Sequence, residues 1–233
     1  MGLGGGLGLN CLTSVCPLGD SITLGSGTAA ADSTKNTGYR NPLWALGQAG
    51  GVPMFFMGQS SLQHDASVAQ IYHDGVAGDT IAMIQARALV SIPIHVPEVL
   101  LLHAGTNDIN IFSTAAATCL TALDALILLC WNLGQRPGIN RLKLIEVAQI
   151  PRLPNANDSI VTTYNAGIPA LASAHRAAGR NVRVVDMNTP LGDPLGSLFN
   201  QASAPHPNAA GYQVMAQQWY GTPGSGLLCD WTR

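Results

Sequence analysis

Short apolar segments alternate along this chain with longer segments of helical pattern, and this alternation limits the folds open to it. Five apolar segments predict strands, at residues 14–18, 53–57, 98–103, 142–149 and 181–186. Five helical patterns lie between and after them, at residues 39–48, 80–91, 114–133, 158–178 and 208–219. Such alternation predicts an α/β fold, a three-layer α/β/α sandwich with a five-stranded, mostly parallel sheet.

The third and fourth predicted strands are apolar almost throughout, at residues 99–102 and 144–147. Continuous apolar runs are typical of strands that helices cover on both faces. No repeat, block of charge or linker divides the chain. We therefore expect one domain over residues 11–233, preceded by a flexible Gly-rich tail at residues 1–10.

Charged residues make up only 10% of the chain, and the net charge is −2. This composition argues against nucleic acid and acidic membranes as partners, and it suits a neutral substrate. No apolar run approaches the roughly 18 residues of a membrane span. Residues 1–10 carry no Lys or Arg and no signal-peptide cleavage pattern. They are typical of an expression remnant or of a mature secreted protein whose signal has been removed, and we expect secretion.

The five cysteines indicate no metal site, because no Cys/His spacing fits zinc. Cys119 and Cys130 fall on one predicted helix, about 16 Å apart at the helical rise per residue. A disulfide needs Cα atoms within about 7 Å, so these two are expected to be buried thiols. Cys11, Cys16 and Cys229 lie nearer the termini, and pairing among the five stays open.

Polar or glycine-rich loops follow the predicted strands, at the edge where α/β sheets bind ligands. Ser21 follows the first strand, residues 75–79 follow the second, residues 105–108 follow the third, and His206 lies beyond the fifth. A serine needs a neighbouring base to become a nucleophile at neutral pH, and His206 is the natural candidate. The pair predicts ester hydrolysis.

Four sequence blocks resemble those of the SGNH hydrolases, the GDSL-type esterase superfamily, and they occur in the same order over residues 17–212. The blocks are Gly19-Asp20-Ser21, Gly78, Gly105-Thr106-Asn107-Asp108 and His206-Pro207-Asn208. Three stretches, at residues 73–75, 102–109 and 164–169, further resemble the acetyl xylan esterase branch. The resemblance implies a flavodoxin-like sandwich, a small-molecule or carbohydrate ester as substrate, and neither a cofactor nor a metal.

The resemblance also implies a role for each matching residue. Ser21 would attack the ester carbonyl, while His206 would take its proton and later protonate the leaving alcohol. The backbone N–H groups of Ser21 and Gly78 and the side-chain amide of Asn107 would form the oxyanion hole.

Four further polar residues flank the expected site. We expect Asp20 and Asp108 to hold the loops in shape, and His73 and His103 to have structural hydrogen bonds.

One position departs from the family pattern. The family has an aspartate three residues before the histidine, and this chain has Ser203 there. Ser203 itself or a backbone carbonyl would orient His206 in a Ser–His dyad, Asp193 would reach the ring from another loop, or the enzyme is impaired. The dyad and the impaired enzyme are favoured over Asp193.

The sequence therefore predicts a serine esterase that removes short acyl groups, chiefly acetyl, from a carbohydrate such as acetylated xylan. The alternative from another class is a catalytically impaired relative that binds acylated glycans or another ligand. A lipase or thioesterase for longer acyl chains would need an apolar channel. The apolar stretch beside the site, residues 109–112, is interpreted as core packing.

Overall fold

The computed structural model describes residues 13–28, 37–61, 72–138, 141–200 and 205–221. The predicted tail at residues 1–10, and with it Cys11, Ser203 and Cys229, lies outside these ranges. The strands are β1 (Thr13–Gly19), β2 (Met54–Phe56), β3 (Asp74–Gly75), β4 (Val99–His103), β5 (Leu144–Gln149) and β6 (Val182–Asp186). The helices are α1 (Ser21–Leu24), α2 (Arg40–Ala49), α3 (Ile81–His95), α4 (Thr106–Asn110), α5 (Ala116–Gly134), α6 (Asp158–Ala177), α7 (Asn188–Leu191) and α8 (Ala209–Tyr220).

The strands form a parallel sheet in the order β2-β1-β4-β5-β6, and β3 pairs with β1 on the same edge as β2. All five predicted strands are present. The expected count of five is nevertheless wrong, because the sheet has six strands. The additional strand, β3, has only two residues within a polar loop, too few to show an apolar run or an alternation in the sequence.

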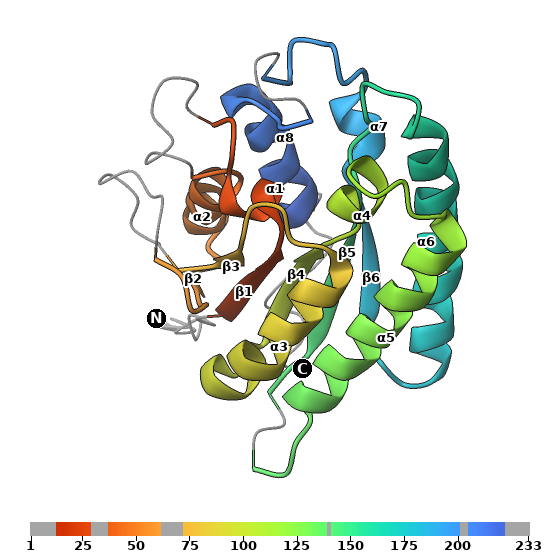
Figure 1. Ribbon diagram of the computed structural model, residues 1–233. Helices are drawn as coiled ribbons and strands as arrows, with labels where there is room; N and C mark the ends of the chain where they lie inside the picture. The colour runs from red at the N-terminus through yellow and green to blue at the C-terminus, as the bar shows by residue number, and fades with distance from the viewer. Residues whose placement is uncertain (1–12, 29–36, 62–71, 139–140, 201–204, 222–233) are drawn as a thin grey trace, which may run out of the picture.

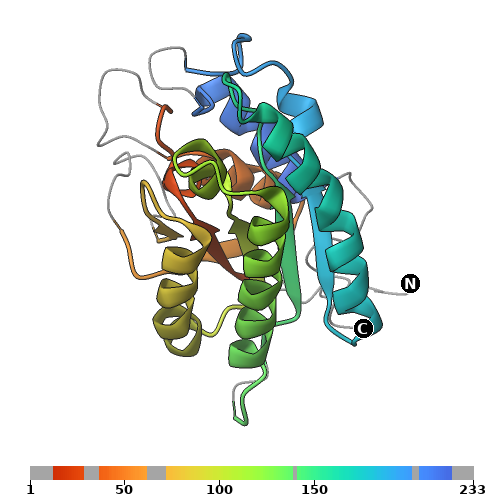
Figure 2. The same cartoon turned by 45° about the vertical axis from the view of Figure 1, so that its right-hand side comes forward.

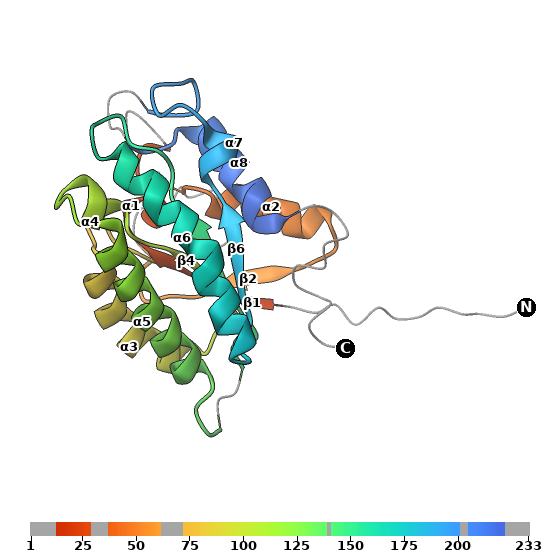
Figure 3. The same ribbon diagram turned by 90° about the vertical axis from the view of Figure 1, so that its right-hand side faces the viewer.

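Helices cover both faces of the sheet, which confirms the predicted three-layer sandwich (Figure 1). Helices α3, α5 and α6 lie side by side over one face (Figure 2), and α2 and α8 cover the other (Figure 3). The first layer is built on apolar residues of α3, α5 and α6 that include Ile84, Leu123 and Ile168. The second is built on residues of α2 and α8 that include Leu43 and Trp219.

Strand β1, which is paired on both sides, contains a proline, which a fully paired strand would not tolerate. The carbonyls of Val15 and Gly19 accept hydrogen bonds from the β2 and β3 side, from Met57 and Val76. Every second residue of a strand faces the same edge, so Pro17 also faces this side. Its position falls between the end of β2 pairing at Val15 and the start of β3 pairing at Leu18. Pro17 therefore lacks its N–H at a point where neither β2 nor β3 pairs with β1, and no hydrogen bond of the sheet is lost.

Helix α5, of 19 residues, is long and apolar enough by length and composition to cross a membrane, with a mean hydropathy of 1.7 over an 18-residue window. The expectation that no apolar run approaches this length is wrong by that criterion. Its buried residues, from Cys119 to Leu133, pack into the core between α3 and α6. That packing is typical of a core helix.

Cys16, Cys119 and Cys130 are buried free thiols. Burial raises the pKa of the Cys119 thiol to about 11, so the thiol stays protonated at neutral pH. The expectation of buried thiols at Cys119 and Cys130 is confirmed. Within the described ranges Cys16 forms no disulfide, and Cys11 and Cys229 lie outside those ranges.

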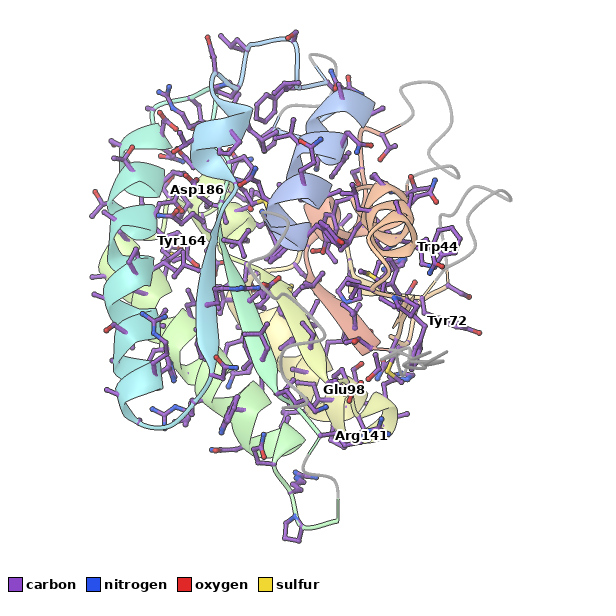
Figure 4. The ribbon with its side chains drawn as sticks, turned by 180° about the vertical axis from the view of Figure 1, so that it is seen from behind. Trp44, Tyr72, Glu98, Arg141, Tyr164 and Asp186 are labelled. Atoms are coloured by element: carbon purple, nitrogen blue, oxygen red, sulfur yellow. The ribbon has the colours of Figure 1, made fainter. Side chains whose placement is uncertain are left out.

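The order of the strands reverses between β1 and β4, since the chain runs from β1 outward to β2 and then crosses back to β4. Ligand sites of parallel sheets lie at such a reversal, outside the carboxyl ends of the strands. The short helices α1, α4 and α7 follow β1, β4 and β6 at this end. Figure 4 shows Tyr164 and Asp186 towards it, and Glu98 and Arg141 towards the opposite end.

Candidate active site

Ser21 is the first residue of α1, directly after β1, and it is almost completely buried. The Asp20 carboxylate caps this helix by accepting a hydrogen bond from the backbone N–H of Ile22, 2.9 Å away. Gly25 ends the helix in the left-handed region, at φ 98°. A capped single turn thus places the serine at the carboxyl edge of the sheet.

His206 lies beside Ser21, with 2.8 Å between its Nε2 and the serine Oγ. The backbone around it is held on both sides. The carbonyl of His206 accepts a hydrogen bond from the N–H of Asn200, and the Asn208 side chain caps α8 by accepting from the N–H of Gly211. A Cβ on Gly27 would lie 2.9 Å from the His206 Cβ, so the loop after α1 also packs against the histidine.

Gly78 lies in the loop between β3 and α3, with a φ of 85° and open space where a Cβ would be. The next residue, Asp79, is buried, and its carboxylate forms an ion pair with Arg87 of α3. The side-chain amide of Asn107 donates a hydrogen bond of 2.9 Å to the backbone carbonyl of Asp79. The loop of Gly78 and the side chain of Asn107 are therefore joined.

Asn107 belongs to α4, which begins immediately after β4 with Gly105 at φ 109°. A Cβ on Gly105 would lie 2.8 Å from the ring of Tyr164, whose hydroxyl donates to the carbonyl of Ala104. One residue beyond Asn107, the carboxylate of Asp108 accepts from the N–H of Ile81 at the start of α3. Burial raises the pKa of this carboxyl.

Two buried histidines lie near these loops. His73 accepts a hydrogen bond from the N–H of Gly75 through Nδ1, at 3.0 Å, in agreement with a structural role. His103 was expected to be hydrogen-bonded as well. Neither of its ring nitrogens has a hydrogen-bond partner among the described residues, and its Nδ1 lies 3.6 Å from Oδ1 of Asp20. Its ring therefore lies against the nucleophile loop without a hydrogen bond to it.

The group that orients His206 stays open, because Ser203 lies outside the described residues. Asp193 is exposed, and its carboxylate accepts a hydrogen bond from the N–H of Leu195. This bond closes a local turn, and it assigns Asp193 a role in the shape of its own loop.

The apolar stretch at residues 109–112 is only partly core. Ile109 is fully buried, as expected, but Ile111 and Phe112 are 56% and 62% exposed. The interpretation as core packing is wrong for these two side chains, because the chain turns outward after α4.

An open pocket of about 470 Å³ lies beside the His206 loop. Its lining residues are Gly27, Thr28, Phe199, Asn200, Asn208, Ala209 and Ala210. Within the described ranges, no group of three His, Cys, Asp or Glu residues is placed to hold a metal ion.

Arg87 is the site residue that the sequence analysis missed. It is the single Lys or Arg in the otherwise largely apolar helix α3, and this isolation was the one available signal. It contacts Gly19 at the end of β1, Asp74 in β3 and Asp79 in the loop after β3, and only the tertiary structure shows these contacts together.

A family model described as the GDSL-like Lipase/Acylhydrolase family matches residues 18–214. Comparison with curated proteins finds no match. The solved structure of a family 3 carbohydrate esterase from Clostridium thermocellum is similar, with a TM-score of 0.75 and 25% identity over 90% of this chain and 94% of that one.

Two further solved structures share the fold. A carbohydrate esterase family 3 protein from Talaromyces cellulolyticus has a TM-score of 0.71 and 20% identity, over 90% of this chain and 95% of that one. The acetylxylan esterase Axe2 from Geobacillus stearothermophilus has a TM-score of 0.60 and 18% identity, over 89% of this chain and 93% of that one.

Proposed function

Since the chain belongs to the GDSL-like lipase/acylhydrolase family, we propose that it is a serine esterase that hydrolyses short-acyl esters, chiefly acetyl esters of carbohydrates. One observation carries the proposal: Oγ of Ser21 and Nε2 of His206 are 2.8 Å apart at the carboxyl edge of the sheet. This is the distance at which a histidine accepts the proton of a serine nucleophile.

The reaction proceeds in two halves. Oγ of Ser21 attacks the ester carbonyl carbon while its proton passes to Nε2 of His206. His206 then gives this proton to the alkoxide oxygen as the alcohol leaves, and an acyl group remains on Ser21. Water attacks the acyl carbon and gives a proton to His206, which returns it to Ser21 as the carboxylic acid departs.

Three donors stabilise the negative charge on the carbonyl oxygen: the backbone N–H groups of Ser21 and Gly78, and Nδ2 of Asn107. Nδ2 of Asn107 has one hydrogen on the carbonyl of Asp79, which leaves its second hydrogen for the oxyanion. The open space around Gly78 lets a substrate approach its backbone closely.

A carbohydrate ester fits the low charge of the chain, because a neutral, hydroxyl-rich substrate needs hydrogen-bond partners rather than opposite charge. Two of the similar structures are described as carbohydrate esterases and a third as an acetylxylan esterase. Secretion, as expected from the sequence, would bring such an enzyme to a polymeric substrate.

Labelling with a fluorophosphonate probe tests the nucleophile. We expect rapid labelling of the folded protein, and its loss in Ser21→Ala and His206→Ala. Ser26→Ala and His95→Ala are matched controls, since Ser26 lies just beyond α1 and His95 in the last turn of α3. Wild-type protein that folds but resists the probe would contradict the esterase and favour an impaired, ligand-binding relative.

Nitrophenyl esters from acetyl to octanoyl test the acyl preference. We expect the highest kcat/KM with acetyl and a steady fall with chain length. A maximum at octanoyl would instead identify a lipase or thioesterase, with the exposed Ile111 and Phe112 as candidate contacts for the chain.

A further inference from the structure

We infer that Arg87, paired with Asp79, is a positioning residue that aligns all three oxyanion donors. The inference rests on the proposed function and goes beyond it, because Arg87 belongs to none of the four sequence blocks. Arg87 itself does not face the substrate in this assignment. It acts through the backbone and side chains that do.

The guanidinium contacts three separate segments of the site. Nη2 forms the ion pair with the Asp79 carboxylate, while Nη1 donates to the carbonyl of Asp74 at 3.1 Å and to that of Gly19 at 3.4 Å. Gly19 ends β1 two residues before Ser21, and Asp74 begins β3 four residues before Gly78. One side chain therefore joins the nucleophile loop, the start of the Gly78 loop and the residue after Gly78.

The third donor depends on the same network through Asp79. The carbonyl of Asp79 accepts the hydrogen bond from Nδ2 of Asn107, at 2.9 Å. The carboxylate of Asp79 is fixed by Arg87, so the peptide that orients the Asn107 amide is held in place. Movement of Asp79 would displace the N–H of Gly78 on one side and the amide of Asn107 on the other.

The pair is shielded enough for this role. The side chains of Arg87 and Asp79 are only 16% and 9% exposed. Ion pairs that are fully exposed to water contribute little to stability, and this pair is not one of them. Arginine suits the position, because its planar fork has donors for a carboxylate and for carbonyls at the same time. A lysine ammonium would keep the charge and lose the fork.

Steady-state kinetics with nitrophenyl acetate test the inference. For Arg87→Ala we expect kcat to fall by about 10²-fold, the effect of a displaced oxyanion donor, with KM within about twofold. Arg87→Lys restores part of this loss. Asp79→Ala lowers kcat to a similar degree, and the double variant is no worse than either single one, since both remove the same contact.

Two further readouts separate positioning from a general loss of structure. Arg183→Ala is the matched control, because Arg183 forms an ion pair with the buried Glu146 between β6 and β5, away from the site loops. It is expected to lower stability and leave kcat unchanged. The apparent pKa of kcat/KM is expected to be the same in Arg87→Ala as in wild type, because the base is His206. An unchanged kcat in Arg87→Ala, or an equal fall in Arg183→Ala, would overturn the inference.

A measurement that does not depend on turnover completes the test. In NMR spectra of the full chain, Arg87→Ala is expected to shift the amide resonances of Gly78 and Asn107 and to speed hydrogen exchange at Gly78 at least tenfold, while Arg183→Ala does neither. Wild-type protein without Ser21-dependent turnover would defeat the proposed function alone. Unchanged resonances and exchange at Gly78 in Arg87→Ala would defeat the positioning inference, whether the protein is active or not.

Discussion

Oγ of Ser21 lies 2.8 Å from Nε2 of His206, although 185 positions of the chain separate the two residues. Ser21 is held by the single-turn helix after β1, and His206 by the loop that leads into α8. The hydroxyl of Tyr212 on α8 donates to the carbonyl of Ser26, 2.7 Å away, which joins these two parts directly. The nucleophile and the base are thus aligned by the docking of α8 beside α1.

Asn107→Ala is expected to lower kcat on nitrophenyl acetate by about 10²–10³-fold, because it removes one oxyanion donor from a site that binds developing charge. KM changes little, because the ground-state carbonyl needs the donor less than the oxyanion does. Asn110→Ala, in the last position of the same helix, is the control and keeps full activity. A fall confined to KM would contradict the assignment of Asn107.

Replacing Gly19 or Gly78 by alanine is expected to destabilise the protein for different reasons, a steric clash at Gly19 and backbone strain at Gly78. A Cβ on Gly19 would collide with the carbonyl of His103 and the hydroxyl of Thr23, so Gly19→Ala lowers the free energy of unfolding by about 3 kcal/mol. Gly78 has open space and only the strain of its φ of 85°, so Gly78→Ala costs about 1 kcal/mol. Urea unfolding measures both, and the reverse order would show that these glycines are placed differently.

Glu146 on β5 makes stability depend on pH. Burial raises its carboxyl pKa to about 7, and the ion pair with Arg183 offsets only part of this effect. Below the unfolded pKa, near 4.5, both states hold the proton and no stability is lost. As the pH rises from there to about 7, the unfolded state releases the proton first, so stability falls by about 3 kcal/mol.

Glu146→Gln is expected to abolish that fall, as shown by urea unfolding at pH 4.5 and pH 8. Glu98→Gln is the control and keeps it. Burial acts to raise the pKa of Glu98 too, but the hydrogen bonds from Lys143 and the Ser14 N–H and the nearby charges of Lys143 and Arg141 together outweigh it, so the net shift is downward. A wild-type protein equally stable at both pH values would contradict the assignment to Glu146.

Ser203→Asp adds a carboxylate at the position where the family has its triad acid. We expect kcat on nitrophenyl acetate to rise at least tenfold, because a negative charge beside the imidazole stabilises the imidazolium of the transition state. Ser203→Asn, of the same shape without the charge, serves as the control. Equal rates in wild type and Ser203→Asp would mean that another group already supplies the orientation.

The other five strands and the five longer helices were predictable because each lies in a segment long enough to show an apolar run or a helical period, even β2, whose three residues fall within the run at residues 53–57. The apolar run of β4 and the repeat of α6 are examples. Strand β3 and the helices α1, α4 and α7 were not predictable. They have two to five residues, and their hydrogen bonds come from caps and neighbouring loops rather than from a local pattern.

The residue types in the candidate site followed from motifs, since Ser21, Gly78, Asn107 and His206 each stand in a block with a recognisable spacing. The sequence alone determined the layers of the fold and the family, because hydrophobic period and motif order are properties of the chain. Only the tertiary structure decided that Ser21 meets His206 and that Arg87 connects the end of β1 with β3 and the loop after it. Those contacts join segments far apart in the chain, and their distances depend on how the helices pack against the sheet.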